Sequence, residues 1–324
     1  MKNAFAVISI AGFVLIAAGP LQAQTWPQKP LRLIVPFPPG GGNDLIGRLV
    51  AQSLTKRLGQ TVFVDNRAGA NGIIGLQALK QAPADGYTLG TSSDGPLTIS
   101  PAIYASLPYE PHSDFAPLAL AITQPIVLVV HPSMPVRTIK QLLTLAQARP
   151  AAVAYSSFGV GNISHLSAEL LSAAGGARFL HVPYKGGEAA TVAVRSGEVQ
   201  MLFGTVQNVL EHTRAGKLIP LGTGEAVGQR LPALPEVPAI AETVAGYETR
   251  TWNGFIAPAK TPTAIVELLS REIRAVMQEK DIIAQLTALG ATAAPLGPEE
   301  FGAVMRRDAE KWTALAKARG IRAE

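Results

Sequence analysis

The sequence predicts an α/β fold in which helices cover largely parallel sheets. Short apolar runs that are typical of strands alternate with amphipathic helical patterns along most of the chain. Three strand-to-helix connections are rich in glycine and small polar residues. The 324 residues contain 48% hydrophobic and 16% charged side chains, which is enough apolar material for two compact lobes.

The first strand–loop–helix unit covers residues 31–54. The apolar run Leu31–Val35 predicts a strand, and Pro36 ends it because proline has no N–H to donate. The three glycines at 40–42 allow a tight loop, and Asn43 or Asp44 is expected to cap the helix that follows. Main-chain amides and the positive end of the helix dipole therefore meet at one point, which favours binding of an anion.

The next elements follow in the same alternation. Strands are predicted at 61–64, 87–91, 126–130, 153–156, 179–182 and 199–203, and helices at 72–80, 139–146, 164–174, 188–195 and 206–215. A capping-box pattern starts the helix at Thr138, and Gly216 ends the last of these helices. The last third of the chain reads as a Pro-rich irregular segment at 231–239, followed by helices at 267–280, 281–289 and 299–318.

The N-terminus reads as a secretory signal peptide over residues 1–23. Lys2 precedes an apolar run at 4–18, and the small residue Ala23 suits the position before cleavage. An uncleaved membrane anchor is the alternative, but the run is shorter than the roughly 20 residues that a spanning helix needs. We therefore predict an exported, periplasmic protein cleaved near Ala23.

Composition excludes several other classes. The chain has no cysteine, which rules out disulfides, thiolate catalysis and lipid attachment through an N-terminal cysteine. Its net charge of +5 comes from scattered basic residues rather than a basic stripe, so nucleic acid is not an expected partner.

Two further loops carry polar residues at predicted strand ends. In the loop 65–75, Gly69 and Asn71 suit unusual backbone angles and Gly72 allows close packing, although a tight structural turn explains the pattern equally well. The loop 156–165 could hold a polar ligand with hydroxyls and amides, or could be an ordinary helix start capped by Asn162 or Ser164. Neither the loop 65–75 nor the stretch 40–47 has the glycine order of a dinucleotide site, and the chain has no P-loop.

Catalytic and metal-binding patterns are absent from the sequence. The five histidines are dispersed, and neither H-E-x-x-H nor G-x-S-x-G occurs. His165 is interpreted as a helix-start or packing residue, and Asp44 as a helix cap or a ligand clamp. Tyr247 and Trp252 are expected to pack in the core or between lobes. No cofactor and no metal are expected.

The ordered motifs of the chain resemble those of the tripartite tricarboxylate transporter substrate-binding proteins, also called Bug or TctC-like proteins. The resemblance extends from about Trp26 to the C-terminus. The residues that carry it in the first half are Val35-Pro36-Phe37, Gly40-Gly41 with Asp44, Asn66-Arg67 with Gly69-Ala70 and Gly72, Asp85-Gly86-Tyr87-Thr88-Leu89 and Leu107-Pro108-Tyr109. Those in the second half are Ser157, Gly159 and Gly161 with His165-Leu166, Val182-Pro183-Tyr184-Lys185-Gly186, Ala215-Gly216-Lys217-Leu218, Leu234-Pro235, Gly246-Tyr247-Glu248, Trp252 with Gly254, and Ala257-Pro258.

This resemblance implies a type II periplasmic-binding-protein fold with two lobes, two crossing strands and a ligand cleft between them. Lobe 1 is expected at 24–124 and 228–324, and lobe 2 at 125–227. Relatives bind small carboxylates through the loops at the strand ends, largely with backbone amides. Carried onto this chain, the expected ligand-binding residues are Phe37, Pro38, Gly41, Asp44, Asn66, Gly69, Ala70, Gly72, Ser93, Ser157, Gly159, Asn162, His165 and Thr205.

The chain departs from the family pattern at three places, one of which is Asn162, where relatives often carry Ser or Thr. Gly204 and then Thr205 stand where many relatives carry an Asp after the strand, which disfavours an amino-acid ligand. Asp94 is expected to add negative charge near the site. The identity of the carboxylate therefore cannot be carried over.

Three functions are compatible with these features. The first is a monomeric periplasmic solute-binding protein that captures a small organic carboxylate for uptake by the membrane subunits of a tripartite tricarboxylate-type transporter. The alternatives are a ligand-loaded sensor for a signalling receptor and an exported α/β enzyme that acts on a small acid.

Overall fold

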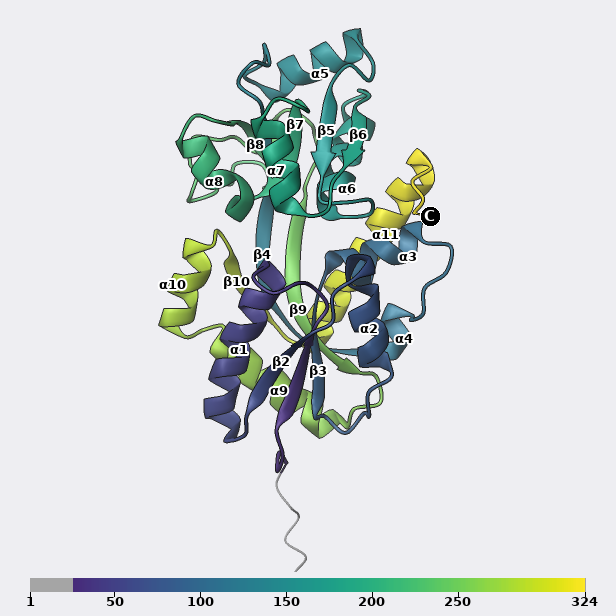
Figure 1. The fold of residues 1–324 in the computed structure, drawn as a ribbon, viewed down its shortest axis with the longest axis vertical. Coiled ribbons are helices and arrows are strands. Elements are labelled where there is room, and N and C mark those ends of the chain that lie inside the picture. Colours follow the sequence, from purple (N-terminus) through teal and green to yellow (C-terminus); the bar gives the residue numbers. More distant parts are fainter. Residues whose placement is uncertain (1–25, 324) are drawn as a thin grey trace, which may run out of the picture.

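The structure is a computed structural model, and it describes residues 26–323. The predicted signal peptide and its cleavage site at Ala23 lie outside these residues. The described chain forms two α/β lobes that are joined through long strands (Figure 1).

The strands are β1 (Leu31–Val35), β2 (Val62–Asn66), β3 (Thr88–Ser93), β4 (Phe115–Val130), β5 (Ala154–Ser157), β6 (Leu180–Pro183), β7 (Met201–Thr205), β8 (Ile219–Thr223), β9 (Arg250–Pro258) and β10 (Thr292–Leu296). The α-helices are α1 (Gly42–Leu58), α2 (Ile73–Lys80), α3 (Ser100–Ile103), α4 (Pro111–Asp114), α5 (Ile139–Ala148), α6 (Ile163–Ala174), α7 (Gly187–Arg195), α8 (Val206–Arg214), α9 (Thr263–Val276), α10 (Lys280–Ala288) and α11 (Pro298–Arg319). A short π-helical segment, η2 (Gly95–Ile99), precedes α3.

One continuous path of strands runs through both lobes in the order β2-β1-β3-β9-β4-β7-β5-β6, and β8 and β10 also pair with β4. Strands β2, β1 and β3 are parallel in the first lobe, and β7, β5 and β6 are parallel in the second. The crossing strand β4 pairs with β9 through Phe115–Pro125 and with β7 through Ile126–Val130. The carboxyl ends of both parallel sets therefore lie toward the junction between the lobes, where ligands of such sheets bind.

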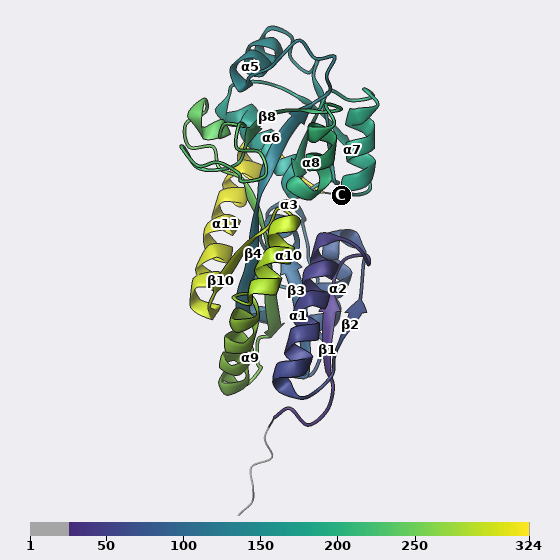
Figure 2. The same ribbon diagram turned by 90° about the vertical axis from the view of Figure 1, so that its left-hand side faces the viewer.

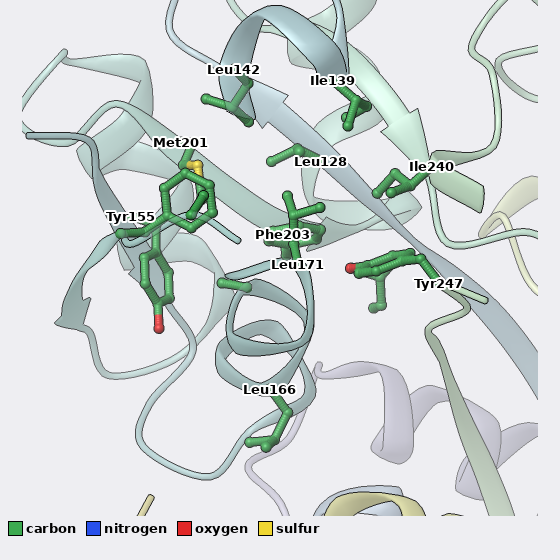
Figure 3. Packing of buried hydrophobic residues seen from close by; sticks show 14 of the residues in the cluster. Leu128, Ile139, Leu142, Tyr155, Leu166, Leu171, Met201, Phe203, Ile240 and Tyr247 are labelled. Carbon is green, nitrogen blue, oxygen red and sulfur yellow. The ribbon is translucent and has the colours of Figure 1, made fainter. Parts of the chain in front are cut away.

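Each lobe has an apolar layer on both faces of its sheet. In the first lobe, α1 and α9 cover one face, and α2 and α11 cover the other, where Trp252 meets Phe301 edge-on at 5.2 Å. In the second lobe, the largest cluster gathers Tyr155, Phe203 and Tyr247 around β4 and α6 (Figure 3). The prediction that Trp252 and Tyr247 serve packing is confirmed, since they are 2% and 1% exposed.

The return to the first lobe comes late in the chain. Leu231, Leu234 and Val237 pack with Val127 of the second lobe, and Tyr247 packs there as well. The boundary that we predicted at residue 228 therefore lies inside chain that packs on the second lobe, and the crossing back is β9. Helix α11 also reaches from one lobe to the other, because its last turns contribute Trp312 and Leu315 to the second-lobe cluster (Figure 2).

Most predicted elements are present, with small shifts of their ends. The prediction missed β8, β9, β10 and the first two-thirds of β4. The predicted helix at 267–280 is α9, which spans Thr263–Val276. The predicted side-chain cap of α1 is wrong: the helix begins at Gly42, Gly41 occupies the N-cap position, and Asp44 lies within the first turn.

Candidate functional site

The two loops of the first lobe are tied together by the Asp44 side chain. Its carboxylate is 2% exposed and accepts hydrogen bonds from the Gly40 amide at 2.9 Å, Asn66 Nδ2 at 2.8 Å and Arg48 Nε at 2.9 Å. Asn66 Nδ2 also donates to the Phe37 carbonyl at 3.1 Å. Asp44 and Asn66 are thus engaged with the protein, and they fix the distance between the β1–α1 and β2–α2 loops.

The protonation state of Asp44 follows from these partners. Burial alone would raise the pKa of its carboxyl, but the hydrogen bonds from Arg48, Gly40 and Asn66 outweigh it and hold the pKa below the usual value. The Arg48 guanidinium also neutralises the negative charge of Asp44 next to the N-terminus of α1. An anion at this terminus therefore faces a helix dipole whose nearby carboxylate is already paired.

The β2–α2 loop has an unusual backbone. Gly69, Ala70, Asn71 and Gly72 have consecutive positive φ angles of 136°, 46°, 51° and 91°. The expectation of special backbone angles at Gly69 and Asn71 is confirmed. Ala70 was not foreseen in this region, where a β-carbon costs about 1–2 kcal/mol. Such strain persists where the surrounding structure requires it, often at functional sites.

The remaining first-lobe residues surround this loop. A β-carbon placed on Gly72 would lie 3.3 Å from the Phe37 ring, so glycine allows the two loops to pack closely. Phe37 is half-buried, while Pro38 and Gly41 are exposed. Ser93 ends β3 at the same edge of the sheet and is 8% exposed.

Asp94, which follows Ser93, is buried rather than exposed to solvent. Thr251 Oγ1 donates to its Oδ1 at 2.8 Å, and its Oδ2 has no partner within residues 26–323. Burial raises the pKa of this carboxyl to about 7; the Thr251 bond opposes the shift and nearby Asp308 adds to it. The carboxyl that we expected to add negative charge near the site is therefore buried, and its burial favours the neutral form.

Buried polar side chains of the second lobe hydrogen-bond to the loop between β5 and α6. Ser157 is 0% exposed, its Oγ accepts from the Gly159 amide at 3.2 Å, and it lies 2.6 Å from His181 Nε2. His165, which is 6% exposed, accepts the Gly161 amide on Nδ1 at 3.2 Å. This burial agrees with the interpretation of His165 as a packing residue.

Asn162 acts as the N-cap of α6. Its Oδ1 accepts the Ser164 amide at 3.2 Å, as the capping alternative predicted. The side chain of Asn162 is half-buried, and Gly159 beside it is half-buried too.

Thr205 and the N-terminus of α8 complete the second-lobe side. Thr205 Oγ1 donates to Asn208 Oδ1 at 2.6 Å, and within the described residues no side chain caps α8 or α1. The first turn of α8 contains no acidic residue. A β-carbon on Gly42 at the start of α1 would lie 3.7 Å from Gln207 Oε1. Two uncapped helix N-termini, one from each lobe, therefore face each other across the junction.

A second contact joins the lobes close to the β5–α6 loop. A β-carbon on Gly161 would lie 2.1 Å from Ile103 Cδ1 of α3, so a larger residue would displace the end of the Ile103 side chain, and the φ of +72° also favours glycine. The predicted residues of the first lobe lie at the ends of β1, β2 and β3, and those of the second at the ends of β5 and β7. A hollow of about 480 Å³ lies elsewhere on the second lobe, lined by residues such as Gln147, Ser172 and Arg319.

Sequence reasoning missed three groups at this junction. Gln207 carries no motif that marks it. His181 and Thr251 become neighbours of Ser157 and Asp94 only through strand pairing, because His181 lies opposite Tyr155 in the parallel β5–β6 pair. Within residues 26–323, no cluster of three or more His, Asp or Glu side chains could hold a metal ion.

The two-lobed fold and the paired loops at the strand ends define the class of periplasmic binding proteins. The chain matches the family described as "Tripartite tricarboxylate transporter family receptor" over residues 46–321, and it belongs to this family, whose members are solute-binding proteins. The resemblance in the sequence motifs is thereby confirmed. BugT of Bordetella pertussis is 34% identical over 327 residues, which cover 99% of each chain.

Two solved structures support the same assignment. The structure of R. palustris Rpa4515 with adipate has a TM-score of 0.83 and 31% identity, and the match covers 92% of this chain and 99% of that one. MatC from Rhodopseudomonas palustris with bound malate has a TM-score of 0.77 and 26% identity, with coverage of 90% and 99%.

Proposed function

We propose that this protein is a periplasmic solute-binding protein that captures a small organic carboxylate between its lobes, without catalysis, for uptake by a tripartite tricarboxylate-type transporter. The observation that carries the proposal is the pair of uncapped helix N-termini, α1 and α8, that meet at Gly42 and Gln207. Helix N-termini present free amides and a positive dipole end to an anion. The relatives solved with adipate and malate support a carboxylate as that anion.

The carboxylate would be held by backbone amides rather than by a dedicated cation. Arg48 of α1 and Arg67 after β2 are already paired, with Asp44 and Asp65 respectively. The glycine-rich loops bring amides to the junction, and closure of the lobes around the ligand would exclude water and strengthen these bonds.

Export to the periplasm is part of the proposal. The N-terminal sequence pattern and the family's periplasmic members support it. None of the helices in residues 26–323 combines the length and the apolar character needed to cross a bilayer. We propose that the mature chain starts near Gln24, acts as a monomer and delivers its ligand to membrane subunits of the transporter.

The enzyme alternative has one observation in its favour, the 2.6 Å separation between Ser157 Oγ and His181 Nε2. This is the spacing of a nucleophile and its base. However, the Ser157 side chain is 0% exposed and engaged with Gly159, so a substrate carbonyl has no approach to it. A structural role of the pair is therefore the better interpretation.

Thermal unfolding of the mature chain in the presence of adipate, malate, benzoate and glutamate tests the proposal. A ligand at about 100 times its Kd should add roughly 2.7 kcal/mol to the free energy of unfolding, which raises the midpoint by several degrees. Adipamide, which has the length of adipate without its charges, is the matched control and should leave the midpoint unchanged. A flat response of refolded, ligand-free protein to all four acids would overturn the proposal.

A substitution tests the facing helix termini directly. Gln207→Glu places a carboxylate of the protein itself at the N-terminus of α1, so it should compete with the ligand and weaken carboxylate binding by roughly tenfold or more. Gln278→Glu makes the same change at an exposed position after α9 and should have no effect on binding. If the two variants bind the carboxylate with equal affinity, the anion does not lie at the N-terminus of α1.

A further inference from the structure

Three aromatic rings pack together directly beneath the second-lobe loop. The His165 and His181 rings are stacked with centroids 3.9 Å apart and an interplanar angle of 7°. The Tyr155 ring stacks on His181 at 4.9 Å and lies 6.4 Å from His165. Stacking at these distances fixes both imidazole rings in position and orientation.

Each imidazole holds one end of the short stretch from Ser157 to Gly161. His181 Nε2 is hydrogen-bonded to Ser157 Oγ, which in turn accepts the Gly159 amide. His165 Nδ1 accepts the Gly161 amide, so this nitrogen carries no proton and the neutral ring has its proton on Nε2. Gly159 and Gly161 have φ angles of +131° and +72°, and a chain this flexible needs external restraints to keep one conformation.

We propose that His165 and His181 are positioning residues for the carboxylate-binding loop of the second lobe: they set the backbone of Ser157–Gly161 and do not touch the ligand. This inference rests on the proposed function. It assigns a role in binding to His181 and replaces the expected ligand contact of His165 and Ser157 with a supporting one. Both histidines and Ser157 are buried or half-buried behind the loop, which agrees with such a role.

Burial keeps both imidazoles neutral, and the carboxylate nearest to the ring stack is already paired. Tyr155 Oη donates to Glu169 Oε1 at 3.0 Å, and Arg319 Nε donates to Glu169 Oε2 at 2.9 Å. The Glu169 carboxylate is therefore already satisfied by Arg319 and Tyr155. Burial lowers the pKa of His165 to about 4; burial and then the neighbouring His165 lower that of His181 to about 3, although Glu169 opposes this.

Acid should therefore release the loop. Protonation of His165 at Nδ1 would turn the acceptor of the Gly161 amide into a second donor, and two stacked imidazolium rings would repel each other. The affinity of the protein for the carboxylate should stay constant from pH 8 to pH 6 and should fall as the pH approaches the pKa of His165.

Paired variants separate the hydrogen bond from the stacking. His165→Phe keeps a flat ring but loses the acceptor, whereas His165→Asn places its Oδ1 near the former Nδ1 position. Isothermal titration of the mature chain with adipate at pH 7 should show roughly tenfold weaker binding for His165→Phe, the loss expected for one missing hydrogen bond. His165→Asn should bind within a few-fold of the wild type, and it should lose the part of the acid dependence that His165 causes.

Amide hydrogen exchange gives a readout that needs no ligand. The Gly161 amide should exchange faster in His165→Phe than in the wild type and His165→Asn. If the wild type binds adipate and the two variants bind and exchange alike, the inference is overturned. If the wild type binds no carboxylate but exchange separates the variants, the positioning role stands and the proposed function fails.

The second histidine provides an independent pair. His181→Gln retains a side-chain amide that can reach Ser157 Oγ, and His181→Phe does not. Faster exchange at Gly159 and weaker adipate binding in His181→Phe alone would support the inference even if a variant at 165 does not fold. Identical behaviour of the two variants at 181 would contradict the role of His181.

Discussion

Asp94→Asn should stabilise the protein at alkaline pH and leave it nearly unchanged in acid. Asp94 is 2% exposed, accepts one hydrogen bond from Thr251 and has burial as the main cause of a pKa of about 7. Asparagine has the same shape and keeps an acceptor for the Thr251 hydroxyl. The substitution therefore removes the titration of this site without opening a cavity.

The magnitude follows from the difference between the folded and unfolded pKa values. The carboxyl titrates at about 7 when folded and near its reference value of 3.8 when unfolded. Because the folded pKa is raised, the contribution of this group to stability is fully present below pH 3.8 and is lost as the pH rises through 7. A shift of about three pKa units corresponds to about 4 kcal/mol at about 1.4 kcal/mol per unit.

Urea unfolding of the wild type and Asp94→Asn at several pH values measures this difference. The two proteins should have similar free energies of unfolding at pH 4, and the variant should be more stable by up to about 4 kcal/mol at pH 8. A difference that does not change between pH 4 and pH 8 would refute the reasoning. It would mean that Asp94 is ionised in the folded state at all these pH values.

Asp114→Asn is the matched control because its pH trend has the opposite sign. The hydrogen bond from the Glu110 amide is the main cause of a lowered pKa of the Asp114 carboxyl; burial opposes it, and the hydrogen bond and positive charge of Lys80 add to the lowering. A lowered folded pKa contributes stability above the unfolded pKa that is lost as the pH falls. Asp114→Asn should therefore be destabilising at pH 7 and close to neutral in strong acid.

Two further changes test the packing of the loops, and both can be measured by urea unfolding of the mature chain. Asp44→Ala should lower the free energy of unfolding by about 2–3 kcal/mol, because it leaves the Arg48, Asn66 and Gly40 donors without their common acceptor. Asp44→Asn should lower it by less. Equal losses of stability would argue against the Asp44 carboxylate as the group that connects the two loops. Gly224→Ala should cost about 3 kcal/mol or more, since its β-carbon would lie 2.0 Å from the Thr249 carbonyl oxygen. A β-carbon at Gly216 would meet open space, and only the φ of +66° opposes it, so Gly216→Ala should lower the free energy of unfolding by about 1 kcal/mol.

The fold was predictable wherever periodicity reflects burial, and it was missed where proline and glycine interrupt the pattern. β4 contains Pro117 and Pro125, and β10 contains Pro295, which argue against strands because each removes an N–H. In the structure, the register of β4 against β9 shifts next to Pro117, and Pro125 lies where β4 passes from one lobe to the other. The prolines are tolerated where the pairing is irregular or changes partner, and a single sequence does not show which strands pair.

The location of the candidate site was predictable because parallel strands place their carboxyl ends together. The roles of the individual residues were not. Asp94 was expected to add charge near the site, but it is buried, and its hydrogen-bond donor Thr251 lies far along the chain in β9. His181 lies in a strand that carries no loop motif, and its contact with Ser157 follows from the β5–β6 pairing.

The polar motif residues at this junction share one property in both lobes: their side chains point to the loops' own backbone. Asp44 holds the Gly40 amide and Asn66 holds the Phe37 carbonyl in the first lobe, while His165 holds the Gly161 amide in the second. The surfaces that remain for a ligand are then mainly main-chain groups and helix N-termini. A substitution at a motif residue should therefore change affinity through the shape of the loop, and the choice among carboxylates should depend on neighbouring positions such as Gln207 that no motif marks.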